Sequence, residues 1–337
     1  MPKKRIGVIY GSKSGEYEVS IVSASNVMEA MDKDKYEIVK IFISKNLEWY
    51  IGGRPEEGGR AFSPWEIPSV CDFALPILHG PNGEDGTVQG LLELLNIPYG
   101  GCGLLGCAAV MDKIVAKEIF ASAGIPQVPY ISLSSYDLDD EERRAAKIKE
   151  ISEGLELPYF VKPANMGSSV GITKVKTAEE LLPALLEAER YDSRIVVEHG
   201  IDCREMETGC MGNDSIEVAD VGEVLTGAEF YTYDDKYVDG VSHTQIPADI
   251  SEKEREYIRS YAKKAYLAAG CFGFARCDFM IDKKDGQIYI NEINAIPGFT
   301  NISMFPKLFM AAGYSYPQII ERIIELGYER YNVKNNR

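Results

Sequence analysis

Two stretches near the C-terminal end alternate apolar and polar residues: Phe274-Ala-Arg-Cys-Asp-Phe-Met-Ile-Asp282 and Gln287-Ile-Tyr-Ile-Asn-Glu-Ile-Asn294. Alternation with a period of two is typical of β-strands that have one covered face. Lys284-Asp285-Gly286 lies between them and is predicted to form a three-residue loop, with its glycine in the left-handed conformation. The two stretches therefore predict an antiparallel β-hairpin.

The register of this hairpin brings four polar residues together. With a three-residue loop, Asp278 lies opposite Glu292 and Arg276 lies opposite Asn294, and the period of two places all four on one face. Two carboxylates and an amide oxygen form a hard-oxygen site suited to Mg²⁺. An adjacent arginine can neutralise charge that develops on an attacked group. A two-residue loop would instead divide the set between both faces.

The apolar neighbours of this set indicate whether its face is covered. Ile288, Ile290 and Met280 are expected to continue the same face, which favours a covered site. The alternative is a solvated sheet face that carries an ordinary salt bridge.

Charge and cysteine usage exclude several classes of protein. The chain has 337 residues with 36 Lys+Arg and 52 Asp+Glu, and its formal net charge is −16. Binding to nucleic acid or to an anionic membrane requires clustered positive charge, so neither is expected as a partner. Seven cysteines, none in a C-x-x-C spacing, favour free thiols in a reducing cytoplasm over disulfides or a zinc site.

The order of the predicted elements divides the chain into three parts. Over residues 1–110, short buried strands alternate with amphipathic helices, which is typical of a parallel α/β layer. From residue 111 to about 200, helices are followed by paired strands, and the hairpin belongs to residues 201–337. We therefore expect a multidomain protein of mixed α/β and α+β class.

A glycine-serine loop, Asn165-Met-Gly-Ser-Ser-Val-Gly171, is predicted between strands at 159–162 and 170–175. Glycine lets the backbone approach a ligand closely, and serine hydroxyls with free N–H groups can hold phosphate oxygens. The order of residues is not that of a Walker loop. A flexible hairpin turn is the competing interpretation.

Two further stretches carry residues suited to ligand binding. His79-Gly80 follows a predicted parallel strand, where ligands bind in α/β layers, although an isolated histidine is more often structural. Residues 84–87 are interpreted mainly as helix capping. Lys236-Tyr237 lies in the tyrosine-rich stretch 230–240, which suits a mobile lid over a phosphate.

Together these motifs resemble the ATP-grasp superfamily, and more closely the D-alanine–D-alanine ligases. The resemblance extends over nearly the whole chain, from Gly11–Ser20 to Pro297–Pro306. It implies an ATP-grasp fold preceded by an N-terminal parallel α/β domain. The intermediate matches are His79-Gly80 with Gly83–Gly86, Met111–Lys113, Val161–Gly171, Glu229–Tyr237 and the hairpin set.

The family pattern implies a role for each matching residue. ATP phosphates would be held by Lys113, Lys162 and Lys236, under the loop that contains Ser168 and Ser169. Adenosine would lie along Glu198, His199, Gly200 and Ile201, with Glu205 at the ribose and Phe230 also in the nucleotide site. Two Mg²⁺ ions (Mn²⁺ possible in their place) would be bound by Asp278, Glu292 and Asn294.

The resemblance also implies how the substrates would be held. Glu16 would bind the ammonium of the first D-alanine, with His79 nearby, and a triad would fasten the lid: Glu16, Ser168 and Tyr237. The tetrahedral oxyanion would be stabilised by Arg276 and the Gly298 N–H, and the second substrate's carboxylate would meet Ser303 and Met304. Tyr10 and His199-Gly200 depart from the common pattern. Because adenine contacts in such proteins are largely made by the backbone, the second departure affects only the side-chain roles of His199 and Gly200.

The resemblance implies a homodimer that makes D-alanyl-D-alanine for peptidoglycan through a D-alanyl phosphate. The second site lacks an arginine after Ser303, which favours D-alanine over D-serine or D-lactate as acceptor. A catalytically silent ATP-binding regulator is the alternative from another class, and the intact hairpin set argues against it. An NAD-dependent oxidoreductase has little support, because the first glycine turn lacks G-x-G-x-x-G.

Overall fold

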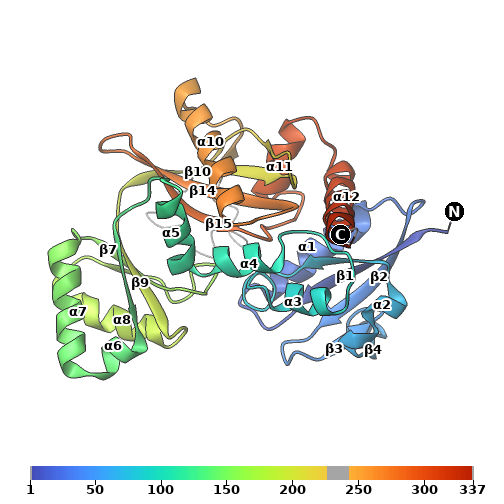
Figure 1. The fold of residues 1–337 in the computed structure, drawn as a ribbon, viewed down its shortest axis with the longest axis horizontal. Coiled ribbons are helices and arrows are strands. Elements are labelled where there is room, and N and C mark those ends of the chain that lie inside the picture. The colour runs from blue at the N-terminus through green and yellow to red at the C-terminus, as the bar shows by residue number, and fades with distance from the viewer. Residues whose placement is uncertain (1, 226–242, 336–337) are drawn as a thin grey trace.

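The structure is a computed structural model that describes residues 2–225 and 243–335. It contains three sheets. Figure 1 shows the N-terminal and central sheets at opposite ends of the molecule, with the C-terminal sheet above and between them.

Five strands form the N-terminal sheet: β1 (Lys4–Gly11), β2 (Tyr36–Ile43), β3 (Trp49–Ile51), β4 (Arg60–Ala61) and β5 (Phe73–Ile77). Their order is β4-β3-β2-β1-β5, and β1 pairs in parallel with both β2 and β5, as the alternation of strands and helices predicts. The accompanying helices are α1 (Tyr17–Ala30), α2 (Ile67–Val70), α3 (Thr87–Leu94) and α4 (Leu104–Met111), with short 3-10 turns at Pro55–Glu57 and Pro64–Glu66.

Helix α1 is fixed at the edge of this sheet where its parallel strands end. The buried Ser20 hydroxyl donates to the Ile77 carbonyl and accepts from the Gly11 N–H, so it joins α1 to the ends of β5 and β1. The carboxyl ends of parallel strands are where α/β layers bind ligands. This edge therefore directs the N-terminal part toward the cleft described below.

Four antiparallel strands form the central sheet in the order β6-β9-β7-β8: β6 (Tyr130–Ser134), β7 (Tyr159–Pro163), β8 (Thr173–Val175) and β9 (Arg194–His199). Strand β8 is shorter than the predicted 170–175, because positive φ angles at Ser168, Ser169 and Gly171 extend the loop. The helices are α5 (Lys113–Ser122), α6 (Ser135–Asp139), α7 (Glu141–Gly154) and α8 (Leu181–Glu189), with a 3-10 turn at Ala178–Glu180.

Six strands form the C-terminal sheet: β10 (Cys203–Met211), β11 (Glu217–Val218), β12 (Gly222–Leu225), β13 (His243–Gln245), β14 (Phe274–Asp282) and β15 (Ile288–Asn294). Their order is β13-β12-β10-β14-β15, with β11 paired to β10. The helices are α10 (Glu252–Ala268), α11 (Met304–Ala311) and α12 (Tyr316–Asn335).

The β14–β15 hairpin has the predicted register at its polar end and a different one near its turn. Asp278 pairs with Glu292 and Arg276 with Asn294, as predicted. Near the turn, Asp282 N–H donates to Gln287 O, so the loop has four residues, 283–286, and the prediction of three is wrong. A β-bulge between the two registers compensates for the extra loop residue.

The same bulge changes which apolar side chains share a face with the polar set. Met280 borders the cleft as predicted, but Ile288 and Ile290 are buried in the core with Phe279 and Ile281. The expectation that both isoleucines continue the polar face is therefore wrong. One inserted residue reverses the side-chain alternation of a strand.

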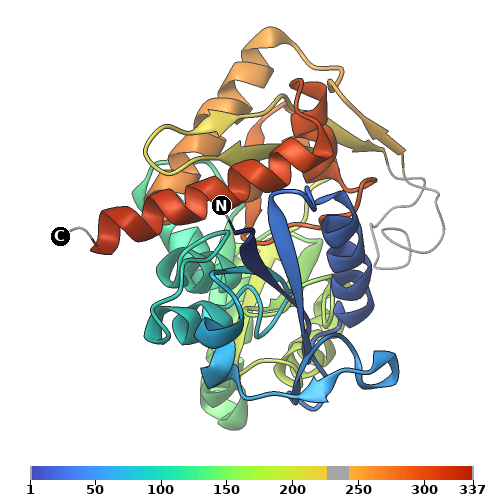
Figure 2. The ribbon, with the colours of Figure 1, turned by 90° about the vertical axis from the view of Figure 1, so that its right-hand side faces the viewer.

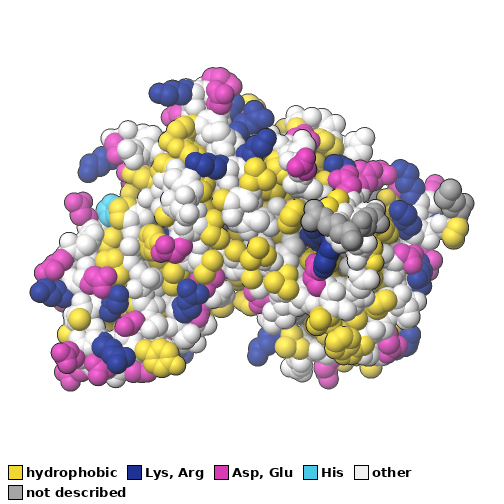
Figure 3. Space-filling model, in the orientation of Figure 1, with side chains coloured by type: hydrophobic (Ala, Val, Ile, Leu, Met, Phe, Trp, Pro, Cys, Tyr) yellow, Lys and Arg dark blue, Asp and Glu magenta, His cyan; other side chains and the backbone are white. Residues whose placement is uncertain are grey.

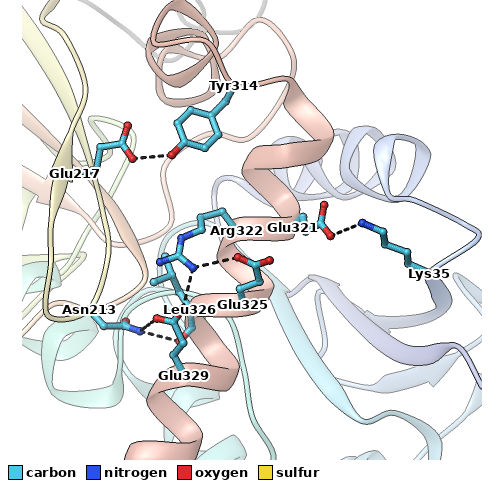
Figure 4. A network of polar contacts seen from close by, with 9 residues as sticks. All are labelled: Lys35, Asn213, Glu217, Tyr314, Glu321, Arg322, Glu325, Leu326 and Glu329. Atoms are coloured by element: carbon cyan, nitrogen blue, oxygen red, sulfur yellow. Dashed lines mark hydrogen bonds and ion pairs between the residues drawn. The ribbon is translucent and has the colours of Figure 1, made fainter. Parts of the chain in front are cut away.

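Helix α12 contacts both the N-terminal part and the segment after β10 of the C-terminal sheet. Figure 2 shows it running across the molecule beside β1, and Figure 4 shows its polar contacts. Lys35 forms an ion pair with Glu321 at 2.6 Å, and the Asn213 side chain donates to Leu326 O at 2.9 Å. Within residues 2–225 and 243–335, no helix combines the length and the apolar character that a membrane span needs.

Candidate functional site

A cleft of about 1540 Å³ is bordered by strands of the central and C-terminal sheets and, from the N-terminal part, by helix α1 and the loop after β5. Among the residues that line it are the predicted site residues Glu16, His79, Lys113, Lys162, Ser168, Ser169, Glu198, His199, Gly200, Ile201, Glu205, Arg276, Asp278, Glu292, Asn294, Gly298, Ser303 and Met304. The predictions for Phe230, Lys236 and Tyr237 lie outside the described residues. Within the described residues, the structure thus brings these distant stretches of the sequence together at one cleft.

We call Glu207, Arg276, Asp278 and Glu292 the hairpin cluster. Glu207 of β10 pairs with Asp278 of β14, which pairs with Glu292 of β15, so three carboxylates form a row across neighbouring strands. The guanidinium of Arg276 contacts Asp278 at 2.7 Å and Glu207 at 2.9 Å. Sequence analysis missed Glu207, although it stands two residues after Glu205 on an alternating strand and so shares its face.

The donor set of the hairpin cluster fits Mg²⁺. Like charges directly opposite on neighbouring strands are destabilising, and a cation bound beside this row would relieve that repulsion. Asn294 donates its amide N–H to Asp278 at 2.9 Å. The described residues contain no group of three or more His, Cys, Asp or Glu side chains arranged around one metal position. Magnesium needs only one or two carboxylates when waters and phosphate oxygens complete its shell.

We call Lys117, Lys162 and Glu198 the lysine cluster. Both oxygens of the buried Glu198 carboxylate are occupied, by Lys162 at 2.6 Å and by Lys117 at 3.0 Å. Burial alone would raise the pKa of Glu198, but the two ammonium groups outweigh it and lower the pKa to about 2. The Glu198 side chain therefore holds the two lysines.

The two lysines respond differently to the same carboxylate. Burial lowers the pKa of Lys117, and Glu198 offsets this only in part. For Lys162 burial also acts to lower the pKa, but the shorter contact with Glu198 outweighs it and the pKa is raised. Sequence analysis missed Lys117, whose position on the apolar face of this helix, between Ile114 and Phe120, was the available signal.

Lys113 connects the lysine-rich side of the cleft with the hairpin cluster. Its ammonium donates to Met166 O at 2.7 Å and lies 3.9 Å from a Glu292 oxygen. Since Met166 belongs to the glycine-serine loop, Lys113 fixes the start of that loop. A phosphate held here would lie between Lys113 and any cation on Glu292.

The glycine-serine loop closes against Glu16. A Cβ added to Gly167 would lie 2.8 Å from a Glu16 oxygen, and one added to Gly80 would lie 2.7 Å from it. Only glycine permits this approach at both positions. The structure thus brings Glu16 and the loop together, as the resemblance implies for the triad, whose third member, Tyr237, lies outside the described residues.

His79 is buried, and both of its ring nitrogens are engaged. Nδ1 lies 2.8 Å from Ile296 O and Nε2 lies 3.0 Å from Ser23 Oγ. Burial lowers the pKa of His79, with a nearby carboxylate, Glu16, acting in the opposite direction. Its ring therefore holds backbone and serine rather than offering a free nitrogen to substrate.

Glu84 differs from the capping residues beside it. Asp85 accepts from Thr87 N and Asn82 N, as expected for a turn that begins a helix. Glu84 instead accepts from Gly80 N and from Ile296 N, both at 2.8 Å. Burial first, and Glu16 second, raise the pKa of Glu84 to about 8.

The predicted acceptor residues lie at the start of α11. Ser303 is the residue before the helix, and its hydroxyl lies 2.8 Å from that of Thr300. Met304 is buried, with its sulfur beside Gly222, so only its backbone N–H can meet a ligand. The first N–H groups of a helix attract a carboxylate.

The remaining residues that are predicted for the adenosine site are held by backbone contacts. His199 Nδ1 lies 2.7 Å from Glu156 O, and the Gly200 N–H donates to Pro158 O at 2.7 Å. The His199 ring therefore points to neighbouring backbone, which agrees with the expectation that side chains matter little here. Ile201 and Glu205 also line the cleft.

Comparison with known proteins identifies relatives over the full length of the chain. Family models described as the D-ala D-ala ligase N-terminus and C-terminus match residues 5–66 with 55–102 and residues 119–325, respectively. A D-alanine–D-alanine ligase of Thermoanaerobacter sp. (strain X514) is 43% identical, with 99% of each chain covered. One of Acetivibrio thermocellus is 41% identical, covering 98% of this chain and 97% of that protein.

Solved structures give the same result. The VanG D-Ala:D-Ser ligase from Enterococcus faecalis superposes with a TM-score of 0.85 at 35% identity, covering 97% of this chain and 100% of that one. The D-alanine-D-alanine ligase from Coxiella burnetii gives 0.84 at 32% identity, covering 100% and 97%.

Proposed function

Since this chain belongs to the D-alanine–D-alanine ligase family and has its ATP-grasp fold, we propose that it joins two D-alanines at the expense of ATP. The product, D-alanyl-D-alanine, serves peptidoglycan precursor synthesis. The observation that carries the proposal is one cleft that holds an acidic cluster and a lysine cluster side by side. Such a cleft suits a polyanionic nucleotide bound together with cations.

The first step makes a poor electrophile reactive. Glu16 holds the ammonium of the first D-alanine, whose carboxylate oxygen attacks the γ-phosphorus of ATP; the bond to the β-phosphate oxygen breaks and ADP leaves. Lys113 and Lys162 neutralise the phosphates. The loop with Ser168 and Ser169 excludes water from the resulting D-alanyl phosphate.

The second step forms the peptide bond. The amine of the second D-alanine attacks the carbonyl carbon of the acyl phosphate, and the carbonyl oxygen becomes an oxyanion near Arg276 and the Gly298 N–H. The C–O bond to phosphate then breaks, its electron pair leaves with phosphate, and the amine loses a proton. The acceptor carboxylate lies at Ser303 and the Met304 N–H.

We include two Mg²⁺ ions in the proposal, with Mn²⁺ as a substitute. Asp278, Glu292 and the amide oxygen of Asn294 would hold them. Bound there, the ions would neutralise charge on the transferring phosphoryl group. The row of carboxylates described above supports this assignment.

We propose D-alanine as the acceptor and D-serine as the alternative. Met304 is buried and stands where an arginine is frequent in resistance-type ligases, so the acceptor site gains no second cation from this position. Similarity to a D-Ala:D-Ser ligase structure at 35% identity is what favours the alternative.

A homodimer and a cytoplasmic location complete the proposal. Hydrophobic side chains gather over α4 on the face shown in Figure 3, where Leu105 is 70% exposed and packs beside Gly270. A second copy could cover this patch. All seven cysteines are free, which is compatible with a reducing compartment.

A competition assay tests the activity and the acceptor together. The protein is incubated with ATP, Mg²⁺ and D-alanine, first alone and then in a mixture that also contains D-serine and D-lactate at equal concentration. The products are identified by their masses, and their amounts are compared. We expect D-alanyl-D-alanine as the main product and ADP in equal amount. ATP turnover without a ligated product would refute the ligase assignment, and a dominant D-alanyl-D-serine product would select the alternative.

A further inference from the structure

The segment that carries the Gly298 N–H is held from both sides by buried side chains of the N-terminal part. Glu84 accepts from Ile296 N–H at 2.8 Å, and His79 Nδ1 contacts Ile296 O at 2.8 Å. On the other side of Gly298, the Phe299 N–H donates to Ser23 Oγ at 3.4 Å. Three side chains therefore fix the peptide groups before and after the predicted oxyanion donor.

The hydrogen-bond directions in this network are determined by one group. Ile296 O can only accept, so His79 must carry its proton on Nδ1 and donate. In the neutral ring Nε2 is then an acceptor, and the Ser23 hydroxyl donates to it. The Ser23 oxygen is then left to accept from the Phe299 N–H. A continuous chain of hydrogen bonds therefore runs from His79 through Ser23 to the segment after Gly298.

The network is buried and spans distant parts of the sequence. Ser23 is 0% exposed and His79 2%, so water cannot replace a lost bond easily. Glu84 also accepts from Gly80 N, which fixes the carboxylate to the loop after β5 that carries His79. A segment held in this way has little freedom to move its N–H away from a developing charge.

We propose that Ser23, His79 and Glu84 are positioning residues that hold the Gly298 N–H at the oxyanion of the second step. This inference rests on the proposed function. His79 then acts through the Ile296 backbone and not by direct contact with D-alanine. Because no tetrahedral carbon forms when the phosphoryl group is transferred, loss of the network slows peptide-bond formation and spares acyl phosphate formation.

Ser23→Ala and Ser20→Ala form a matched pair that tests this. Both serines are 0% exposed on α1 and make two hydrogen bonds, but Ser20 contacts Ile77 and Gly11 and not the segment 296–299. The measurements are dipeptide formation, KM for ATP, and exchange of ¹⁸O between the β,γ-bridging and non-bridging positions of ATP. The exchange reports reversible acyl phosphate formation without the second step.

For Ser23→Ala we expect kcat to fall about 10- to 100-fold, with KM for ATP within about twofold. The ratio of exchange to ligation should rise by the same factor as kcat falls, and Ser20→Ala should keep the parent ratio. Equal losses of exchange and ligation, which leave their ratio unchanged, would overturn the proposal. A parent protein that forms no dipeptide would instead refute the proposed function.

His79→Asn and His79→Ala decide the question if Ser23→Ala does not fold. Asparagine places an N–H where Nδ1 stands and can still donate to Ile296 O, whereas alanine cannot. We expect the exchange-to-ligation ratio to rise more in His79→Ala than in His79→Asn. An equal ratio in both variants would show that the bond to Ile296 does not position the oxyanion donor.

Discussion

The hairpin cluster and the lysine cluster line the same cleft with opposite excess charge. In the hairpin cluster three carboxylates meet one guanidinium, and in the lysine cluster two ammonium groups meet one carboxylate. Lys113 stands between them, 3.9 Å from Glu292. A nucleotide with its cations can therefore be neutralised from both directions.

The two clusters also differ in how far they are enclosed. The Glu198 side chain is 5% exposed and both of its oxygens are paired, whereas the Glu292 side chain is 33% exposed. The lysine cluster is thus an internal structure, of which Lys162 and Glu198 line the cleft. Under the proposed function, the hairpin cluster would bind an ion that arrives with the substrate. Loss of a residue should therefore affect folding in the first case and turnover in the second.

The largest expected effect is on turnover in Asp278→Asn. Removing the central carboxylate of the row lowers the affinity for the cation that neutralises the phosphates, and ADP release should fall at least about 10³-fold. Folding should survive, because opposition between like charges is relieved. Coupled ADP assays and thermal unfolding measure the two effects.

Asp282→Asn is the matched control for this change. Asp282 lies on the same strand and accepts from Lys284 N in the turn, away from the cleft. Its loss should leave turnover within about twofold of the parent. If Asp278→Asn retained activity, the metal would have to be placed elsewhere.

The next largest effect is on stability in Glu198→Gln. Removing the carboxylate leaves Lys117 buried without its counter-charge, and we expect a loss of about 3 kcal/mol in the free energy of unfolding at pH 7. Glu223→Gln, which removes a buried carboxylate from the partly exposed Arg204, should cost less. Urea unfolding compares the variants, and equal losses would contradict the role assigned to burial.

The pH dependence of this loss has a defined sign. The pKa of Glu198 is about 2 in the folded protein, below the ordinary value of 4.5. Its ionised form therefore stabilises the fold fully above about pH 4.5, and this contribution declines as the pH falls from there toward 2. The difference between parent and Glu198→Gln should accordingly begin to shrink between pH 5 and pH 4.

The two clusters were not equally predictable from sequence. Alternation and a short loop predict the pairing of Asp278 with Glu292, and the predicted register is confirmed although the loop length is wrong. The register at the polar end is kept because two irregularities cancel. The loop is one residue longer than predicted, and the bulge places one extra residue on β15. Sequence alternation cannot show a bulge, which is why Ile288 and Ile290 were placed on the wrong face.

Contacts between distant segments set the limit for the rest of the site. The parallel pairing of β2, β1 and β5 follows from local alternation of strand and helix patterns, and the structure confirms it, whereas β3 and β4 join the edge of this sheet antiparallel. Lys117 reads as part of an amphipathic helix until Glu198, from a different strand, is placed beside it. Ile296 meets Glu84 across 212 residues, and no periodicity links them.

A smaller effect is expected for Lys117→Met. Methionine fills a similar apolar volume and leaves Glu198 paired with Lys162 alone, so the cluster loses its excess positive charge. We expect KM for ATP to rise about tenfold with a smaller change in kcat, since the lost charge acts on bound nucleotide before and after the reaction. Steady-state kinetics measure both constants. Lys147→Met, which removes a lysine from α7 outside the cleft, should leave them unchanged.

The smallest effect, a shift in thermal midpoint, separates the clusters without nucleotide. A cation that binds only the folded protein with a Kd near 1 mM adds about 1.4 kcal/mol at 10 mM, or about 1–3 °C for a chain of this size. We expect MgCl₂ to give this shift over NaCl of equal ionic strength in the parent and in Lys117→Met, but not in Asp278→Asn. Sulfate at the same concentration should shift the midpoint in the parent and in Asp278→Asn but not in Lys117→Met, because we expect it to bind at the lysine-rich side. The part of its effect that arises from exclusion from the protein surface is common to all three proteins and cancels in the comparison. If both ions lost their effect in the same variant, the two clusters would act as one site, and the division of the cleft into an acidic and a basic half would fail.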